Sequence, residues 1–264
     1  MSEQKISIGI ITHADTRFGT GHVMRQVAVA DKALEAGYHV RFVVDSDLSM
    51  QLLDKTQHQV SRLRNLKDLA LLQKHLSAER FNYLLIDTHE SLFEQFESVA
   101  DFLPVTLMVS PVGYSFKPYG NAIVYIGCDM NHWTLQTINN DESDTVNLSG
   151  RAWTVFREEF TQGAGMPAAM RSNQILICHG GSDPRQLTAR TLEALELTRD
   201  CYEIVVLAGA GLPDLNRVKS LVNDSKHNCK VIVGEREPSR WMRQAALAII
   251  NGGNIRYELC MTGT

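Results

Sequence analysis

The fold of this chain is indicated most clearly by the stretch Phe18-Gly19-Thr20-Gly21-His22-Val23-Met24-Arg25, a glycine turn between two periodic segments. The apolar run before it, Ile6–Thr12, predicts a buried strand, and apolar residues at helical spacing follow over Val23–Ala36 until Gly37. Glycines let a ligand approach the backbone, and the first turn of a helix offers unpaired N–H groups with a partial positive charge. The stretch therefore predicts a strand–turn–helix unit with room for an anion at the turn.

His22 stands at the start of the predicted helix, where its imidazole would face whatever binds at the turn. Two interpretations remain open from the residues alone. His22 is either an acid–base group or a plain helix-start residue, with Gly19 and Gly21 needed only for a tight turn. The dinucleotide fingerprint G-x-G-x-x-G is not completed, because Met24 occupies the third glycine position.

Composition excludes several classes of protein. A chain of 264 residues with 44% hydrophobic content can bury a large core in one or two domains, and its formal net charge is -4. There is no block of Lys and Arg, which argues against nucleic acid as a partner. There is no apolar run of membrane-spanning length and no secretory leader, so we expect a cytoplasmic protein. The five cysteines form no C-x-x-C pair, and neither a disulfide framework, a metal site nor a cofactor is expected.

Apolar runs alternate with amphipathic helical patterns along both halves of the chain, which predicts an α/β fold with parallel sheets. The strands expected are Ile6–Thr12, His39–Asp45, Tyr83–Asp87, Val105–Val109, Ala122–Ile126, Gln174–Cys178, Glu203–Leu207, Lys230–Val233 and Leu247–Ile250. The helices expected are Val23–Ala36, Leu66–Arg80, Ser91–Phe102, Arg185–Thr198, Leu215–Asn223, Pro238–Ala245 and Arg256–Met261. A polar, irregular stretch separates the halves. We therefore expect two Rossmann-like domains, residues 1–150 and 151–264, that face a shared cleft, the second incomplete at its C-terminal end.

Two further glycine turns follow strands in the second half, Gly180-Gly181-Ser182-Asp183 and Asn251-Gly252-Gly253-Asn254. Ligands of open α/β sheets bind at the carboxyl ends of strands, so each turn is a candidate phosphate site. Each is also a sound helix start, with Ser or Asp as the cap in the first case. Glu258 falls one turn into the helix after the second of them, where a carboxylate can accept hydrogen bonds from a ribose diol. Glycine turns at several strand ends together favour a nucleotide site.

Asp87 ends the predicted strand Tyr83–Asp87 and has two interpretations. It orients an imidazole, that of His22 or His89, or it caps the next helix. His13 and Asp15 end the first strand and are expected near the same edge of the sheet.

These motifs, in this order, resemble a known family. The segments that carry the resemblance are Gly19-Thr20-Gly21-His22-Val23-Met24-Arg25, Gly150-Arg151, Phe156-Arg157-Glu158-Glu159-Phe160, Gly180-Gly181-Ser182-Asp183 and Asn251-Gly252-Gly253-Asn254 to Tyr257-Glu258-Leu259-Cys260. They are similar to the UDP-2,4-diacetamido-2,4,6-trideoxy-β-L-altropyranose hydrolases of pseudaminic acid biosynthesis and to related spore-coat-polysaccharide proteins. They resemble more distantly the lipid II-forming N-acetylglucosaminyltransferase. The resemblance runs from Ile6 to Thr264.

The resemblance implies the two-domain GT-B glycosyltransferase fold, UDP-sugar binding mostly by the second domain, and metal-independent cleavage at the anomeric carbon. It matches His22 to the catalytic histidine of the family. The departures lie on the sugar side: His13 stands where the family has Arg, Thr88 interrupts an Asp-His pair, and Ser110-Pro111-Val112-Gly113 replaces an acidic pair. The identity of the sugar is therefore left open.

Together, motifs and resemblance predict a UDP-sugar hydrolase of cell-surface glycan biosynthesis, in which His22 acts as general base on water beside Asp87. The glycine turns would stabilise the departing diphosphate through backbone N–H groups, without a metal ion. The residues expected to bind the substrate are Gly19, Gly21, Arg25, Gly180, Gly181, Ser182, Asp183, Gly252, Gly253, Asn254 and Glu258. The alternatives are a glycosyltransferase that uses a UDP-sugar, a non-catalytic nucleotide-sugar-binding protein and an inactive fragment.

Overall fold

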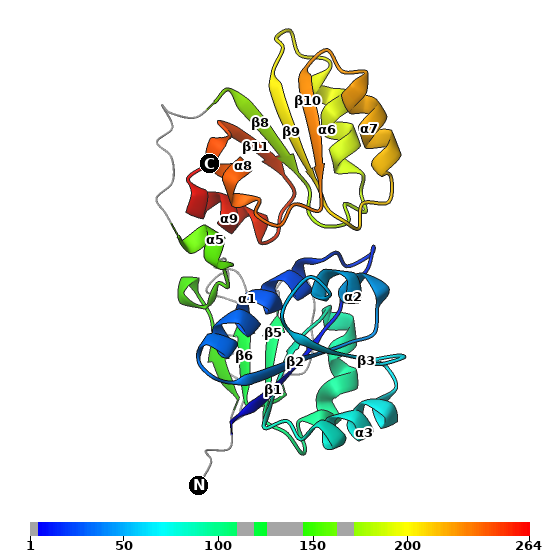
Figure 1. Ribbon diagram of the computed structural model, residues 1–264, viewed down its shortest axis with the longest axis vertical. Helices are drawn as coiled ribbons and strands as arrows, with labels where there is room; N and C mark the ends of the chain where they lie inside the picture. The colour runs from blue at the N-terminus through cyan, green and yellow to red at the C-terminus, as the bar shows by residue number, and fades with distance from the viewer. Residues whose placement is uncertain (1–4, 110–118, 126–144, 163–171) are drawn as a thin grey trace. The chain divides into compact units, whose positions relative to one another are not determined.

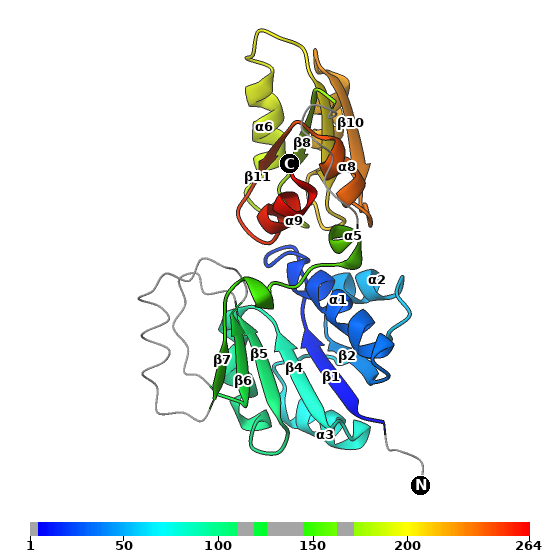
Figure 2. The ribbon, with the colours of Figure 1, turned by 90° about the vertical axis from the view of Figure 1, so that its left-hand side faces the viewer.

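The computed structural model describes residues 5–109, 119–125, 145–162 and 172–264. The chain divides into two compact units (Figure 1). The first comprises Met1–Ala14 and His22–Val155, and the second comprises Asp15–Gly21 and Phe156–Thr264. Each unit has its own parallel sheet with helices on both faces (Figure 2).

The first unit is built on a sheet whose described strands run in the order β3-β2-β1-β4-β5-β6-β7, and every pair is parallel. The strands are β1 (Ser7–Thr12), β2 (His39–Val44), β3 (Gln59–Arg62), β4 (Tyr83–Asp87), β5 (Val105–Val109), β6 (Ala122–Tyr125) and β7 (Val146–Leu148). The helical segments of this unit are α1 (Gly21–Glu35), α2 (Asp47–Leu53), α3 (Leu69–Glu79), and the 3₁₀ segments η1 (Glu90–Val99) and η2 (Arg151–Trp153). Because the central strands are covered on both faces, they are continuous apolar runs.

Side chains of successive strand residues alternate between the two faces of this sheet. Ile10 and Leu85 pack with Val23 and Ala30 of α1 on one face. Ile11, Val43 and Ile86 pack on the other face, in the core that includes Leu72 and Leu76 of α3 and Phe93 and Phe96 of η1. Because of this alternation, the position of a polar residue at the end of a strand determines the face of the sheet on which its side chain starts.

The second unit has a parallel sheet whose described strands run in the order β10-β9-β8-β11. The strands are β8 (Gln174–Cys178), β9 (Glu203–Ala208), β10 (Asn228–Val233) and β11 (Leu247–Ile250). The helices are α5 (Glu158–Thr161), α6 (Leu187–Leu195), α7 (Leu215–Asn223), α8 (Ser239–Gln244) and α9 (Ile255–Thr262). One core joins the sheet to α6 and α7 through Leu192 and Val218, and the other joins it to α5, α8 and α9 through Phe160, Met242 and Leu259.

The predicted α/β class with parallel sheets is confirmed, and the predicted strands and most of the helices are found with boundaries that differ by three residues or fewer. The prediction missed five short elements in the described part of the chain. The segments α2, β3, β7, η2 and α5 were not expected, because a strand or helix of three to seven residues shows too little periodicity to stand out. The expected α-helix at Ser91–Phe102 is the 3₁₀ segment η1. The motif at 110–113 lies outside the described residues.

None of the helices in the described part of the chain is both long and apolar enough to span a membrane.

In the second unit, two strand-end loops approach each other backbone to backbone. The amide of Gly211 donates to the carbonyl of Gly181 over 3.0 Å, and a Cβ added at Gly209 would lie 2.1 Å from that carbonyl oxygen. We therefore expect Gly209→Ala to lower the free energy of unfolding by about 1–3 kcal/mol, because backbone has no rotamer through which to relieve the overlap. Urea denaturation measures this effect. Gly252→Ala is the matched control, because a Cβ there would meet no described atom within 4 Å. Equal stability of the two variants would contradict the close approach.

Candidate functional site

The carboxyl edge of the first sheet holds a buried carboxylate, Asp87, the last residue of β4. Its Oδ1 accepts hydrogen bonds from His22 Nδ1 (2.7 Å) and Arg25 Nη2 (2.7 Å). Its Oδ2 accepts from Arg25 Nε (2.8 Å) and Gln26 Nε2 (2.6 Å). These donors all lie on the first turns of α1, while Asp87 pairs in register with Thr12 of β1. The strand–turn–helix unit thus brings His22 and Arg25 into contact with one carboxylate.

Asp87 is ionised in this network. Burial acts to raise its pKa, but the Arg25 charge and the hydrogen bond from His22 outweigh burial and lower the pKa to about 2. An ionised carboxylate only accepts hydrogen bonds, so the proton of the contact must lie on Nδ1 of His22. In the uncharged form of the ring the lone pair therefore lies on Nε2, and the side chain is 15% exposed. Of the alternatives left open by the sequence, Asp87 orients His22.

The guanidinium of Arg25, a residue expected to contact substrate, lies on Asp87. The side chain is 6% exposed and binds both carboxylate oxygens. It also lies 3.2 Å from Nδ1 of His22, because both groups converge on the same Oδ1. The role of Arg25 in this geometry is to keep Asp87 ionised and in place.

Gln26 is part of this network and was missed by sequence reasoning. The residue is fully buried, and its amide donates to Asp87 and lies 2.8 Å from Sδ of Met108 on β5. The Gln26 amide has Nε2 toward Asp87, because in the flipped orientation the partly negative Oε1 would face the ionised carboxylate. The signal available in the sequence was a polar amide at a position of α1 that helical periodicity assigns to the buried face.

The turn before α1 is held by its own residues. Asp15 Oδ1 accepts from the amides of Arg17 (2.8 Å) and Phe18 (2.6 Å), and the Asp15 carbonyl accepts from Gly19. Gly19 has φ +82, a conformation that favours glycine, whereas a Cβ at Gly21 would meet no described atom within 4 Å. The turn geometry therefore requires Gly19, and open space surrounds Gly21.

At the first glycine turn of the second unit, Asp183 caps α6. Its Oδ1 and Oδ2 accept from the amides of Leu187 (2.9 Å) and Thr188 (2.8 Å), and Ser182 and Asp183 are both buried. The helix accordingly begins at Leu187 rather than at Arg185. Two of the helix N–H groups that were expected to bind a phosphate at this turn are thus occupied by a carboxylate of the chain itself. The carbonyl of Gly181 in this turn is occupied too, by the amide of Gly211.

The second glycine turn differs from the first in being open. Gly252 and Gly253 are exposed, and the side chain of the N-cap residue of α9, Asn254, makes no capping hydrogen bond. Asn251 Nδ2 donates to the carbonyl of His179 over 2.9 Å, which ties this turn to the end of β8. Exposed amides at a helix N-terminus suit an anionic group.

Glu258 lies on α9 one turn beyond that open end, beside Arg157. Its Oε1 is 3.4 Å from Nη2 of Arg157, whose Nη1 lies 2.7 Å from Glu159. Burial raises the pKa of Glu258, while the Arg157 charge acts to lower it. A Glu258 carboxylate that is 22% exposed is not a freely solvated surface group. Its partner is Arg157, a residue to which the sequence alone assigned no role.

Comparisons with known proteins agree with this architecture. No family model matches the chain. It is 23% identical over 264 residues to the spore coat polysaccharide biosynthesis protein SpsG of Bacillus subtilis, covering 97% of this chain and 75% of that protein. It is 20% identical over 267 residues to the uncharacterized protein MJ1062 of Methanocaldococcus jannaschii, of which it spans about half, 54%.

Solved structures of glycosyltransferases share the fold. Acinetobacter baumannii MurG has a TM-score of 0.57 at 14% identity, covering 97% of this chain and 76% of MurG. A UDP-glucosyltransferase from Polygonum tinctorium has a TM-score of 0.60 at 10% identity, with 100% and 79% covered. Anabaena HepE in complex with UDP-glucose has a TM-score of 0.58 at 12% identity, with 97% and 79% covered. The chain therefore has the α/β fold of GT-B glycosyltransferases.

Proposed function

We propose that this protein cleaves a UDP-sugar at the anomeric carbon and transfers the glycosyl group to an acceptor hydroxyl in polysaccharide biosynthesis. The observation that carries the proposal is the His22–Asp87 pair, in which a buried carboxylate holds the imidazole in the tautomer of a general base. The relative SpsG belongs to spore coat polysaccharide biosynthesis, and HepE was solved with UDP-glucose. These similarities support both the pathway class and the donor class.

In the proposed reaction, Nε2 of His22 takes the proton of the acceptor hydroxyl as its oxygen bonds to the anomeric carbon. The bond between that carbon and the β-phosphate oxygen breaks, and UDP leaves with its electron pair. Asp87 stabilises the resulting imidazolium without taking the proton, because its own pKa is about 2. Arg25 and Gln26 hold Asp87 in this orientation.

In the second unit, we propose that the open turn at Gly252 and Gly253 binds the diphosphate through backbone N–H groups, as helix N-termini do for anions. Glu258 would accept hydrogen bonds from the ribose hydroxyls, and these would replace its 3.4 Å contact with Arg157. No step of this proposal requires a metal ion, because the N–H groups stabilise the charge that develops on the leaving diphosphate.

Hydrolysis, which the sequence analysis favoured, would use the same imidazole with water as acceptor. We prefer transfer because the neighbours with this fold are glycosyltransferases. Incubation with UDP-glucose and UDP-N-acetylglucosamine separates the alternatives. UDP release that depends on an added sugar acceptor supports transfer, and release without acceptor supports hydrolysis. Binding of UDP without any release would support a non-catalytic binding protein.

Replacement Glu258→Gln is expected to weaken UDP binding about ten- to a hundredfold, the value of a hydrogen bond to a charged group. The melting temperature should change little, because Arg157 keeps its contact with Glu159. Isothermal titration calorimetry with UDP measures the affinity. Glu203→Gln, an exposed residue at the amino end of β9, is the matched control. Unchanged affinity would remove Glu258 from the nucleotide site.

A further inference from the structure

An arginine of the second unit, Arg157, lies between two carboxylates. Its Nη1 lies 2.7 Å from Oε1 of Glu159 and donates to the carbonyl of Arg236 over 2.8 Å, while its Nη2 lies 3.4 Å from Oε1 of Glu258. The guanidinium also lies over the ring of Phe160, 5.0 Å from the ring centroid. The contacts other than the one with Glu258 therefore fix the position of this positive charge.

Glu159 is itself tied to the fold. Its Oε2 accepts from the amide of Ser239 over 3.0 Å, at the start of α8, and its carbonyl accepts from Nη2 of Arg243 over 2.9 Å. Because Glu159 is anchored in this way, Arg157 keeps its place when ribose hydroxyls take over the contact with Glu258.

The charges that act on Glu258 come from its neighbours in the fold. Burial has the largest effect and raises the pKa of Glu258, the charge of Glu159 adds to this rise, and Arg157 acts to lower the pKa. The thiol of Cys178 on β8 also interacts with Glu258, and it is uncharged because burial raises its pKa to about 11. Arg157 is thus the cation that favours the ionised form of Glu258.

The other elements packed on α9 are α8 and β11. The two arginines at the exposed and partly buried positions of α8 have partners elsewhere, Arg240 with Glu235 and Arg243 with main-chain carbonyls of Glu159 and Gln162. The strand β11 contains no charged residue.

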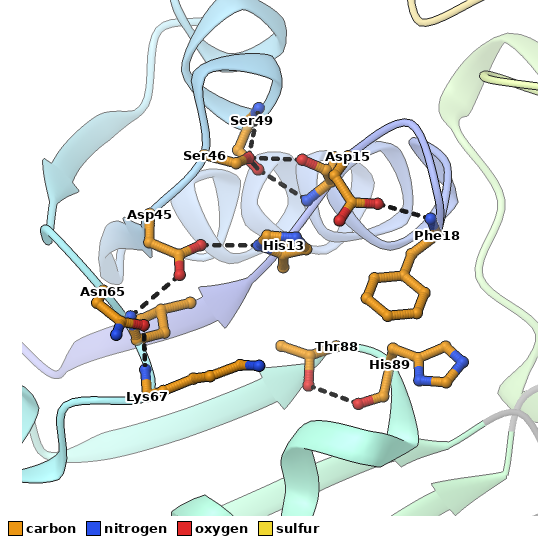
Figure 3. Close-up of polar contacts among 12 residues, drawn as sticks. His13, Asp15, Phe18, Asp45, Ser46, Ser49, Asn65, Lys67, Thr88 and His89 are labelled. Carbon is orange, nitrogen blue, oxygen red and sulfur yellow. Dashed lines mark hydrogen bonds and ion pairs between the residues drawn. The ribbon is translucent and has the colours of Figure 1, made fainter.

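Glu258 has fewer partners than Asp45, a carboxylate of the first unit that is about as exposed. Asp45 lies 2.7 Å from Nδ1 of His13 and accepts from the amide of Leu66 over 3.0 Å (Figure 3). These partners lower the pKa of Asp45 despite burial. In the described part of the chain the side chain of Glu258 has a hydrogen bond only with Arg157, and its pKa remains raised. Its ionisation therefore depends on Arg157.

We propose that Arg157 is a positioning residue of the nucleotide site, which keeps Glu258 ionised so that the carboxylate accepts hydrogen bonds from the ribose of UDP. This inference rests on the proposed function, because it takes Glu258 as the residue that binds the ribose. Hydrogen bonds to an ionised acceptor are stronger than those to a neutral one, so Arg157 extends UDP binding to lower pH.

The test measures the affinity for UDP by isothermal titration calorimetry between about pH 5 and about pH 9, on either side of neutrality. Arg157→Met keeps an apolar stem and removes the charge. Without the cation Glu258 ionises at a higher pH, so we expect binding about tenfold weaker than in the wild type near pH 6 and nearly equal binding at the alkaline end. UDP itself titrates in this range, but its ionisation cancels in the ratio of the two affinities. Arg157→Lys keeps the charge and should restore the wild-type profile.

Glu159→Gln changes the charge in the opposite sense. It removes the anion that raises the pKa of Glu258, so UDP binding should persist to a lower pH than in the wild type. Arg217→Met is the matched control and should behave as the wild type, because it removes an arginine of α7 that pairs with Glu193.

A second readout uses the protein without UDP. In protein labelled at the glutamate Cδ, the resonance that disappears in Glu258→Gln should titrate at a higher pH in Arg157→Met and at a lower pH in Glu159→Gln. Should Arg157→Met fail to fold, the shift in Glu159→Gln carries the test. Midpoints equal to that of the wild type would overturn the inference.

The double variant Arg157→Met with Glu258→Gln shows whether Arg157 acts through Glu258. We expect Arg157→Met to change the affinity for UDP at no pH when Glu258 is already replaced. An equal loss in both backgrounds would mean that Arg157 binds UDP directly or only maintains the fold, and would overturn the inference. Wild-type affinity of Arg157→Met at every pH would overturn it as well, while a loss in Glu258→Gln alone would leave the nucleotide site standing. Unchanged affinity in Glu258→Gln would refute that site itself.

Discussion

His22→Asn is expected to lower kcat for UDP-sugar cleavage about 10²–10⁴-fold, the usual contribution of a positioned general base. Asn keeps a group that can hydrogen bond Asp87 but removes the nitrogen that accepts the proton. The affinity for UDP should remain unchanged, because the proposed nucleotide contacts at Gly252, Gly253 and Glu258 belong to the second unit. Steady-state kinetics with the active UDP-sugar gives kcat, and calorimetry gives the affinity for UDP.

His39→Asn is the control. His39 is an exposed histidine of the same unit at the amino end of β2, whereas Asp87 lies at the carboxyl end of β4. Wild-type turnover in His22→Asn would show that His22 only starts the helix, which is the alternative that the sequence left open. A loss of UDP affinity equal to the loss of kcat would point to misfolding instead.

Asp87→Asn is expected to lower kcat about 10⁴-fold, as loss of the orienting carboxylate does in comparable imidazole–carboxylate pairs. The amide can donate to Nδ1 of His22 and so permits the wrong tautomer. The same variant should lose about 3–5 kcal/mol of stability, because the buried guanidinium of Arg25 is left without its counter-charge. Kinetics together with urea denaturation measures both effects.

Acid unfolding provides the check on this prediction. The pKa of Asp87 is about 2 in the folded protein against an ordinary value of 3.8, so the unfolded chain binds more protons between these values. The ionised group therefore contributes about 2 kcal/mol of stability above pH 4, and this contribution is lost as the pH falls toward 2. Asp87→Asn should lack this part of the acid dependence. An identical acid dependence in both proteins would contradict an ionised, paired Asp87.

Much of the fold follows from local pattern. Apolar runs such as Tyr83–Asp87 and Leu247–Ile250 gave strands with the same boundaries in the structure, because buried parallel strands have a strong local signal. The short elements β3 and β7 have no such signal. They form because the backbone N–H and C=O groups of their neighbours β2 and β6 pair with them, and this pairing depends on the assembled sheet.

The candidate site was predicted in part, for the same reason. His22 and Asp87 stood out as a helix-start histidine and a strand-end aspartate, whereas their contact joins residues 65 positions apart. The placement of Arg25 and Gln26 on Asp87 depends on how α1 packs over β4, which periodicity does not specify. The cap at Asp183 was foreseen as one of two interpretations, and only the geometry of α6 shows which groups it satisfies.

The most direct test of the central claim is the fate of the oxygen that links the sugar to UDP. A UDP-sugar labelled with ¹⁸O in that bridging position is incubated with the wild-type protein and a sugar acceptor, and the products are analysed by mass spectrometry. Cleavage at the anomeric carbon, with His22 activating the acceptor, predicts ¹⁸O in the β-phosphate of the released UDP. Label retained on the free sugar, or release of UMP with a sugar phosphate, would show cleavage at phosphorus and contradict the account.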